Sequence, residues 1–152
     1  MITYTKAKLS DIAQMQNVVK PEVEKGIILF RSSDEMATNI RSYILAKENE
    51  QIIGFGALHF HADDLAEIRS LVVKDGCRGR GVGKGIIHNL LVDGESLGVK
   101  RIFTLTYQKA FFESVGFNEI PKEALPAHKI WADCIKCKHF PICDEIALIK
   151  TI

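Results

Sequence analysis

A turn rich in glycine and arginine is the part of the sequence best suited to bind an anion. It reads RGRGVG at residues 78–83 and joins the apolar run 71–73 to a segment with helical spacing of apolar residues. Glycines at the start of a helix allow backbone N–H groups and the positive end of the helix dipole to point at phosphate oxygens. The net charge of the chain is only +1, so any such attraction is local. The turn therefore predicts a phosphate-bearing ligand, whereas the overall charge does not call for nucleic acid or an anionic membrane.

Two common nucleotide-binding loops do not fit this turn. The P-loop pattern G-x-x-x-x-G-K-[ST] fails because Arg78 replaces its first glycine and Gly85 replaces the hydroxyl residue that binds magnesium. The dinucleotide fingerprint G-x-G-x-x-G would place its third glycine at Lys84 or Ile86, depending on where it starts. The turn is therefore neither a P-loop nor a dinucleotide-binding loop.

The turn does fit the pattern R/Q-x-x-G-x-G/A, at Arg78, Gly81 and Gly83, and the segment FFESVGF follows at residues 111–117. In this order and spacing the two segments resemble the acetyl-CoA motifs of the GNAT N-acetyltransferases. A plain strand-to-helix turn is the alternative. The resemblance implies an α/β fold with a mixed, mostly antiparallel central sheet flanked by helices on both faces, and acetyl-CoA as cosubstrate. The implied cofactor-binding residues are Leu71, Val72 and Val73 beside the pantetheine arm, the turn residues Arg78, Gly79, Arg80, Gly81, Val82, Gly83 and Lys84, of which the last four hold the pyrophosphate, and Phe111 and Phe112.

Four longer segments are similar to one branch of that family, the short bacterial N-acetylglutamate synthases of arginine biosynthesis. They read GIILFRS, ALHFHADDLAEIRSLVV, IFTLTYQKAFFESVGF and KIWADCIKCKHFPICDEIAL, and the last is unusual among GNAT proteins. The resemblance implies acetyl transfer to the α-amine of glutamate or a related amino acid such as glutamine, by direct attack in a ternary complex. Other acceptors, such as a protein N-terminus or a polyamine, and a non-catalytic CoA-binding regulator or zinc-stabilised interaction module stay open.

Acetyl transfer needs a base, because an α-amine is mostly protonated at neutral pH. The resemblance implies Glu67, which lies eleven residues before Arg78. The alternative is a solvated carboxylate, or one paired with Arg69 on the same face of the strand. The family also implies strand N–H groups near residues 71–73 as donors to the thioester carbonyl. Phenylalanines occupy the place of the tyrosine that often protonates the thiolate, so Tyr107 or water is the candidate general acid.

An acceptor such as glutamate carries two carboxylates, which arginine binds in a bidentate manner. Within the resemblance, the candidate substrate-binding residues are Arg31, Arg69 and Lys129. Taken alone, each of them is an ordinary surface cation.

No metal site is predicted, although two groups of residues resemble one. Cys134, Cys137 and Cys143, with His139 or Asp144 near, have zinc-knuckle spacing, but a second pair of ligands is missing. Reduced cysteines that pack an irregular segment are the favoured interpretation. His59 and His61 alternate on one strand face without an evident third ligand, so packing or solvent exposure is expected for them.

Apolar spacing predicts the elements that position these groups. The first helix is expected to weaken at Pro21, and the second to continue through Ile40 to Tyr43 or Ile44. Three prolines make residues 121–143 an irregular excursion. Strands are expected at residues 1–7, 42–47, 52–61, 64–74, 100–107 and 145–152, and helices from Ser10, from Ser32 with its capping-box partner Glu35, from Gly81 to Gly98, and at 109–116.

The length of 152 residues predicts one domain over residues 1–152. No apolar segment approaches the length of a membrane span, and the N-terminal segment lacks a signal pattern. We therefore expect a cytoplasmic protein that binds small molecules rather than nucleic acid or membrane. A homodimer is compatible with the resemblance, because GNAT domains often pair.

Overall fold

A single sheet organises the computed structural model, which describes residues 1–125 and 145–152. Within these residues the strand order is β1-β2-β3-β4-β5-β7-β6. All neighbouring strands are antiparallel except β4 and β5, which are parallel. The predicted mixed, mostly antiparallel sheet is therefore confirmed. The strands are β1 (Ile2–Lys6), β2 (Tyr43–Glu48), β3 (Gln51–Ala62), β4 (Leu65–Val73), β5 (Arg101–Thr106), β6 (Asn118–Ile120) and β7 (Ile146–Thr151).

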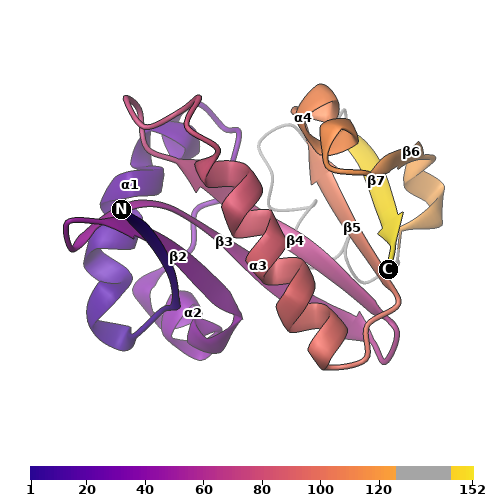
Figure 1. Ribbon diagram of the computed structural model, residues 1–152, viewed down its shortest axis with the longest axis horizontal. Coiled ribbons are helices and arrows are strands. Elements are labelled where there is room, and N and C mark those ends of the chain that lie inside the picture. Colours follow the sequence, from indigo (N-terminus) through magenta and orange to yellow (C-terminus); the bar gives the residue numbers. More distant parts are fainter. Residues whose placement is uncertain (126–144) are drawn as a thin grey trace.

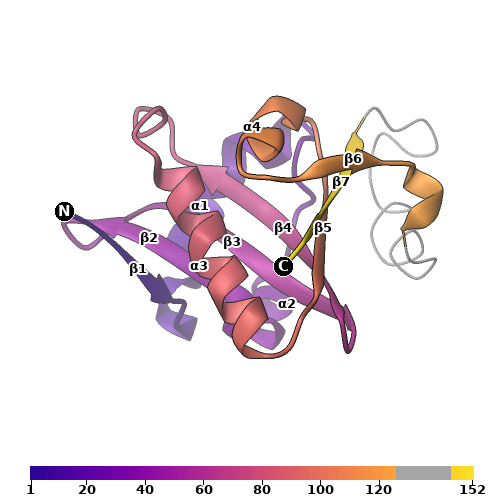
Figure 2. The ribbon, with the colours of Figure 1, turned by 45° about the vertical axis from the view of Figure 1, so that its right-hand side comes forward.

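Helices cover both faces of this sheet, as predicted (Figures 1 and 2). On one face α1 and α2 bury Met15 and Met36 against apolar side chains of β2 and β3. On the other face α3 buries a stripe that includes Ile86 and Leu90, and the short helix α4 adds Phe112 to the same core. The helices are α1 (Ile12–Glu24), α2 (Ser33–Thr38), α3 (Val82–Ser96) and α4 (Lys109–Ser114), with 3-10 turns η1 (Leu9–Asp11), η2 (Ile40–Ser42) and η3 (Lys122–Ala124).

Two helix predictions differ from the structure. Helix α1 continues through Pro21, whose carbonyl still accepts from the Lys25 N–H at 3.1 Å. The helix therefore lacks only the hydrogen bond that Pro21, which has no N–H, cannot donate. The second helix ends at Thr38, and Tyr43 and Ile44 belong to β2, where the sheet buries both side chains. Burial in the sheet thus outweighs the helical spacing at these two positions.

The capping box that opens α2 is confirmed. The Glu35 N–H donates to Ser32 Oγ at 3.1 Å, and the Ser32 N–H donates to Glu35 Oε1 at 3.3 Å. These reciprocal bonds fix where the helix begins, and therefore the path of the loop that carries Arg31.

Strands β4 and β5 separate part-way along their length, as Figure 1 shows. They pair from Leu65 opposite Arg101 to Ile68 opposite Thr104, and no pairing follows. Just beyond that point β4 has a bulge against β3, at which Ser70 adopts a left-handed φ of 56°. A bulge bends its strand and increases the local twist. The sheet therefore opens between β4 and β5.

Within the described residues, no helix is both long and apolar enough to cross a membrane.

Candidate active site

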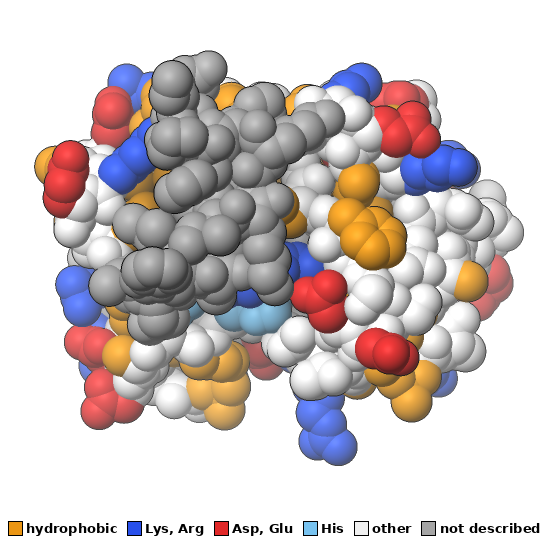
Figure 3. Space-filling model, turned by 180° about the vertical axis from the view of Figure 1, so that it is seen from behind, with side chains coloured by type: hydrophobic (Ala, Val, Ile, Leu, Met, Phe, Trp, Pro, Cys, Tyr) orange, Lys and Arg blue, Asp and Glu red, His pale blue; other side chains and the backbone are white. Residues whose placement is uncertain are grey.

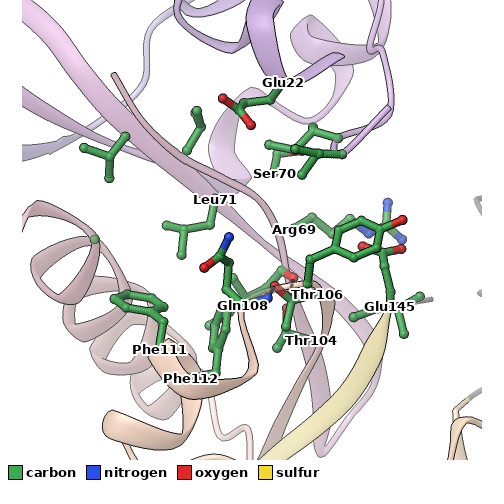
Figure 4. Close-up of a pocket in the computed structure, with 18 of the residues that line it drawn as sticks. Glu22, Arg69, Ser70, Leu71, Thr104, Thr106, Gln108, Phe111, Phe112 and Glu145 are labelled. Atoms are coloured by element: carbon green, nitrogen blue, oxygen red, sulfur yellow. Dashed lines mark hydrogen bonds between the residues drawn. The ribbon is translucent and has the colours of Figure 1, made fainter. Parts of the chain in front are cut away.

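The opening between β4 and β5 contains a cavity of about 890 Å³. Figure 4 shows Leu71, Phe111 and Phe112 on one side of it, and Arg69 and Glu145 on the other. We call these the turn side and the charged side of the cavity. Most of the predicted site residues line this one space, namely Arg31, Glu67, Arg69, Leu71, Val72, Val73, Arg78, Gly79, Gly81, Val82, Gly83, Lys84, Tyr107, Phe111 and Phe112.

The glycine turn has the backbone that an anion site at a helix N-terminus requires. Gly79 and Gly81 have φ values of 80° and 77°, a left-handed conformation that other residues adopt at a cost. Gly81 is the N-cap of α3, which continues for 15 residues. The first N–H groups of a helix have no partner within the helix, so they can bind phosphate oxygens.

The second predicted motif packs directly on this turn. A Cβ built at Gly83 would lie 3.0 Å from Cζ of Phe111. Phe112 lies edge-on to Phe111 and to Phe117, with ring centroids 5.3 Å apart in both pairs. The two motifs, distant in sequence, thus form one wall of the cavity.

The side chain of Arg78 braces the turn. Its Nε donates to the Val73 carbonyl at 3.1 Å, and Nη2 donates to Oε1 of Glu22 at 3.0 Å. Nη2 also lies 3.4 Å from Oδ1 of Asp75. Glu22 is a cavity residue that the sequence did not single out, because it lies on α1, 56 residues before Arg78. Arg78 therefore links the end of β4, the turn and α1.

Arg80 is placed differently from the prediction. It is not among the described residues that line the cavity. Its guanidinium forms a bidentate hydrogen-bonded pair with the carboxylate of Glu48 on β2, in which Nη1 donates to Oε1 at 3.0 Å and Nη2 donates to Oε2. Hydrogen bonding to Arg80 holds the pKa of Glu48 below its ordinary value. The physical reason is the left-handed backbone on either side of Arg80, which sends its side chain away from the cavity.

Glu67 is buried in the wall of the cavity, with 1% of its surface exposed. Its Oε1 accepts from Nε of Arg69 at 2.9 Å and lies 2.8 Å from Nε2 of His61. The pairing with Arg69 that the sequence left open is confirmed, and a solvated Glu67 is wrong. The packing expected for His61 is confirmed, because its ring packs on Phe103, but the sequence did not indicate that the same buried side chain is a partner of Glu67.

Two of the three predicted substrate-binding cations lie in the described part of the cavity. Arg31 and Arg69 both line it. Burial raises the pKa of the nearby Tyr43 hydroxyl, and the positive charges of the two arginines oppose that rise. Arg31 Nη1 also lies 3.7 Å from Oε2 of Glu35. Lys129 lies outside the described residues. On the face of the molecule drawn in Figure 3, a histidine side chain (pale blue) and a Lys or Arg side chain (blue) lie beside an acidic side chain (red).

The described residues contain no group of three or more His, Cys, Asp and Glu side chains placed to hold a metal ion. The alternatives for Cys134, Cys137 and Cys143 remain as the sequence left them, because these residues lie outside the described part of the chain.

A model of the acetyltransferase (GNAT) family matches residues 9–117, a range that includes Glu67, the glycine turn and the second motif. The chain belongs to the GNAT acetyltransferase family. The protein is therefore an acetyl-CoA-dependent N-acetyltransferase, and the predicted cosubstrate is confirmed.

Relatives of this GNAT enzyme include amino-acid acetyltransferases. An amino-acid acetyltransferase of Mycobacterium tuberculosis is 30% identical over 118 residues, which cover 76% of this chain and 67% of that protein. An uncharacterized N-acetyltransferase of Chlorobaculum tepidum is 36% identical over 146 residues, with 96% and 94% covered. An amino-acid acetyltransferase of Shewanella oneidensis is 31% identical over 126 residues, but this chain spans only 28% of its length.

Solved structures show the same GNAT fold. N-acetylglutamate synthase from Neisseria gonorrhoeae, complexed with coenzyme A and N-acetyl-glutamate, has a TM-score of 0.90 at 21% identity over 99% of this chain. This chain spans 35% of that protein. A Mycobacterium tuberculosis protein in complex with CoA has a TM-score of 0.84 at 22% identity, with 99% of both chains covered. The fold inferred from the sequence is thus confirmed.

Proposed function

We propose that this enzyme transfers the acetyl group of acetyl-CoA to the α-amine of L-glutamate or a related amino acid such as glutamine, the first step of arginine biosynthesis. The observation that carries the proposal is that buried Glu67 lines the same cavity as the glycine turn and two arginines, Arg31 and Arg69. The similarity to proteins named amino-acid acetyltransferase supports the same acceptor class. The proposal takes residues 1–152 as one catalytic domain.

The turn side of the cavity suits the cosubstrate. Positive φ at Gly79 and Gly81 and the N-terminus of α3 provide N–H groups for the pyrophosphate. Beyond Ile68, the edge of β4 toward β5 has no paired strand among the described residues. Backbone groups of residues 71–73 on that edge can therefore bond to the pantetheine arm and donate to the thioester oxygen as negative charge develops there.

The charged side of the cavity suits an amino acid. In the proposed reaction Glu67 takes a proton from the α-ammonium group, directly or through water, and the neutral amine attacks the thioester carbonyl. A carbon–nitrogen bond forms and the carbon–sulfur bond breaks. The nitrogen releases its second proton to water, and the thiolate takes a proton from Tyr107 or water. Arg31 and Arg69 bind the carboxylates of the acceptor, since guanidinium groups match carboxylate geometry. Lys129 stays a candidate for the same task.

The experiment is an acceptor survey with purified protein and acetyl-CoA, in which released thiol and the acetylated product are both measured. The panel contains the twenty amino acids, a polyamine and a peptide with a free N-terminus. We expect glutamate or glutamine to give the highest kcat/KM. Transfer to the polyamine or peptide with none to any amino acid would overturn the acceptor class. Binding of CoA without transfer to any amine would favour the non-catalytic alternative.

A further inference from the structure

His61 and Glu67 form a buried polar contact behind the wall of the cavity. His61 Nε2 lies 2.8 Å from Oε1 of Glu67, and the two side chains are 5% and 2% exposed. The same oxygen accepts from Nε of Arg69. Glu67 and Arg69 line the cavity, whereas His61 is not among the described residues that do so. Through this contact His61 can act on the reaction by way of Glu67.

The backbone of β3 directs His61 to this carboxylate. Residues 60 and 62 of β3 oppose residues 66 and 65 of β4, so His61 is the extra residue of a bulge. Bulges change the direction of a side chain without ending the strand. The resulting contact crosses from β3 to the strand that carries Glu67, six residues later in the chain.

The ring of His61 is also held from the other neighbour of β4. It packs on Phe103 of β5, with ring centroids 5.3 Å apart and planes tilted by 37°. Phe103 is 1% exposed and pairs with Glu67 in the parallel register of β4 and β5. A buried imidazole confined between strands loses the freedom to turn away, so it can keep its partner in one orientation.

We propose that His61 is a positioning residue for acetyl transfer: its Nε2–H donates to Glu67 and, together with Arg69, fixes the ionised carboxylate for receipt of the amine proton. The inference rests on the proposed role of Glu67 as base. Donors that bond to a carboxylate favour its ionised form, which is the form that accepts a proton. Among the described residues, the charged or titratable groups that face this pair include Arg69 on β4 and His59, which is opposite Glu67 on β3, and Arg31, Tyr107 and Glu145 line the same cavity as Glu67.

Three variants separate positioning from packing. His61→Phe keeps a ring beside Phe103 but removes the donor, and His61→Gln restores an N–H near the place of Nε2. His88→Gln, on the exposed side of α3, is the matched control for histidine replacement. For each variant, kcat and both KM values are measured across pH with the best acceptor of the wild-type enzyme, and the thermal midpoint of unfolding is recorded.

We expect His61→Phe to lower kcat by about tenfold, because a base that loses a charge-assisted hydrogen bond is no longer held in place. The acid limb of its kcat/KM profile moves to higher pH, since a carboxylate without that donor holds its proton more tightly. The KM for acetyl-CoA stays unchanged. His61→Gln recovers most of kcat, and His88→Gln matches the wild type. The inference is overturned if His61→Phe keeps wild-type kcat and pH profile, or if His61→Gln and His61→Phe lose activity only in proportion to stability.

A second measurement does not depend on activity. The ring ¹⁵N signal of His61, assigned by its loss in His61→Gln, is expected to shift in Glu67→Gln and to stay in place in His88→Gln. An unchanged signal in Glu67→Gln would refute the contact. If the wild-type enzyme acetylates an amine other than an amino acid, the proposed acceptor is wrong, yet the kinetics of the His61 variants with that amine still test the inference. If it acetylates no amine, the proposed function fails and the positioning role fails with it.

Discussion

Phe111 packs so closely on Gly83 that a Cβ at position 83 would lie 3.0 Å from the ring. The contact fixes the distance between the N-terminus of α3 and α4, the two helices that border the turn side of the cavity. Since the same Cβ would lie 3.7 Å from Val73, the end of β4 is also close to this contact. The width of the cavity at this point thus depends on the absence of a side chain.

Gly83→Ala is therefore expected to weaken acetyl-CoA binding. The added methyl must displace Phe111, and overpacking of this kind costs about 1 kcal/mol, or about fivefold in Kd. Isothermal titration with CoA measures the change. The double variant Gly83→Ala/Phe111→Leu gives the methyl room and should recover part of the affinity. Equal CoA affinity in Gly83→Ala and wild type would contradict the close packing described above.

Arg31→Ala is expected to raise the KM for the amino acid while the KM for acetyl-CoA stays the same. Loss of a bond to a charged carboxylate costs about 1.5–3 kcal/mol, which corresponds to a change of about tenfold or more. Arg41, an exposed residue of η2, provides the control variant Arg41→Ala. Steady-state kinetics with both substrates varied distinguish the two KM values. An unchanged acceptor KM would remove Arg31 from the acceptor site.

Glu48→Gln is expected to lower stability in a pH-dependent way. Hydrogen bonding to Arg80 holds the pKa of Glu48 below its ordinary value, so the ionised form is favoured in the folded state. The resulting stabilisation is complete above the ordinary carboxyl pKa and is lost as pH falls through the lower folded value. Thermal midpoints of wild type and Glu48→Gln should differ at about pH 7, and the difference should shrink as pH falls below the ordinary carboxyl pKa of about 4.3. A constant difference, or a changed KM for acetyl-CoA, would disagree with the outward position of Arg80.

Thr104→Val is expected to destabilise the fold at the point where β4 and β5 separate. Thr104 Oγ1 donates to the Ile68 carbonyl at 3.1 Å, at the last pair of the parallel register, and the residue is 3% exposed. Valine has nearly the same shape but leaves that buried carbonyl without this donor, at a cost of about 1–3 kcal/mol. Urea unfolding measures the loss, with Thr3→Val on the exposed edge strand β1 as the control. Equal losses in the two variants would argue against a special role for this bond.

The glycine turn, the strand with Glu67 and the second motif could be predicted because each has a local pattern: glycines at fixed spacing before a helix, an apolar strand that leads into them, and the segment FFESVGF. The contacts between distant segments could not. The Glu22–Arg78 bond joins residues 56 apart, and no local pattern links them. His61 meets Glu67 through a bulge, and a bulge in β3 leaves no clear signature in its sequence. Arg80 lay within the predicted motif, but backbone conformation rather than residue type decides where its side chain points.

In the proposed function Glu67, which is buried beside Arg69 and His61 in the wall of the cavity, is the base of the transfer reaction. Glu67→Gln keeps the shape and removes the proton acceptor, so the most direct test is the pH dependence of its kcat. We predict a fall of about a hundredfold to ten-thousandfold near neutral pH, with the acid limb of the profile abolished and the KM for acetyl-CoA unchanged. A Glu67→Gln enzyme with the kcat and pH profile of the wild type would show that Glu67 is not the base.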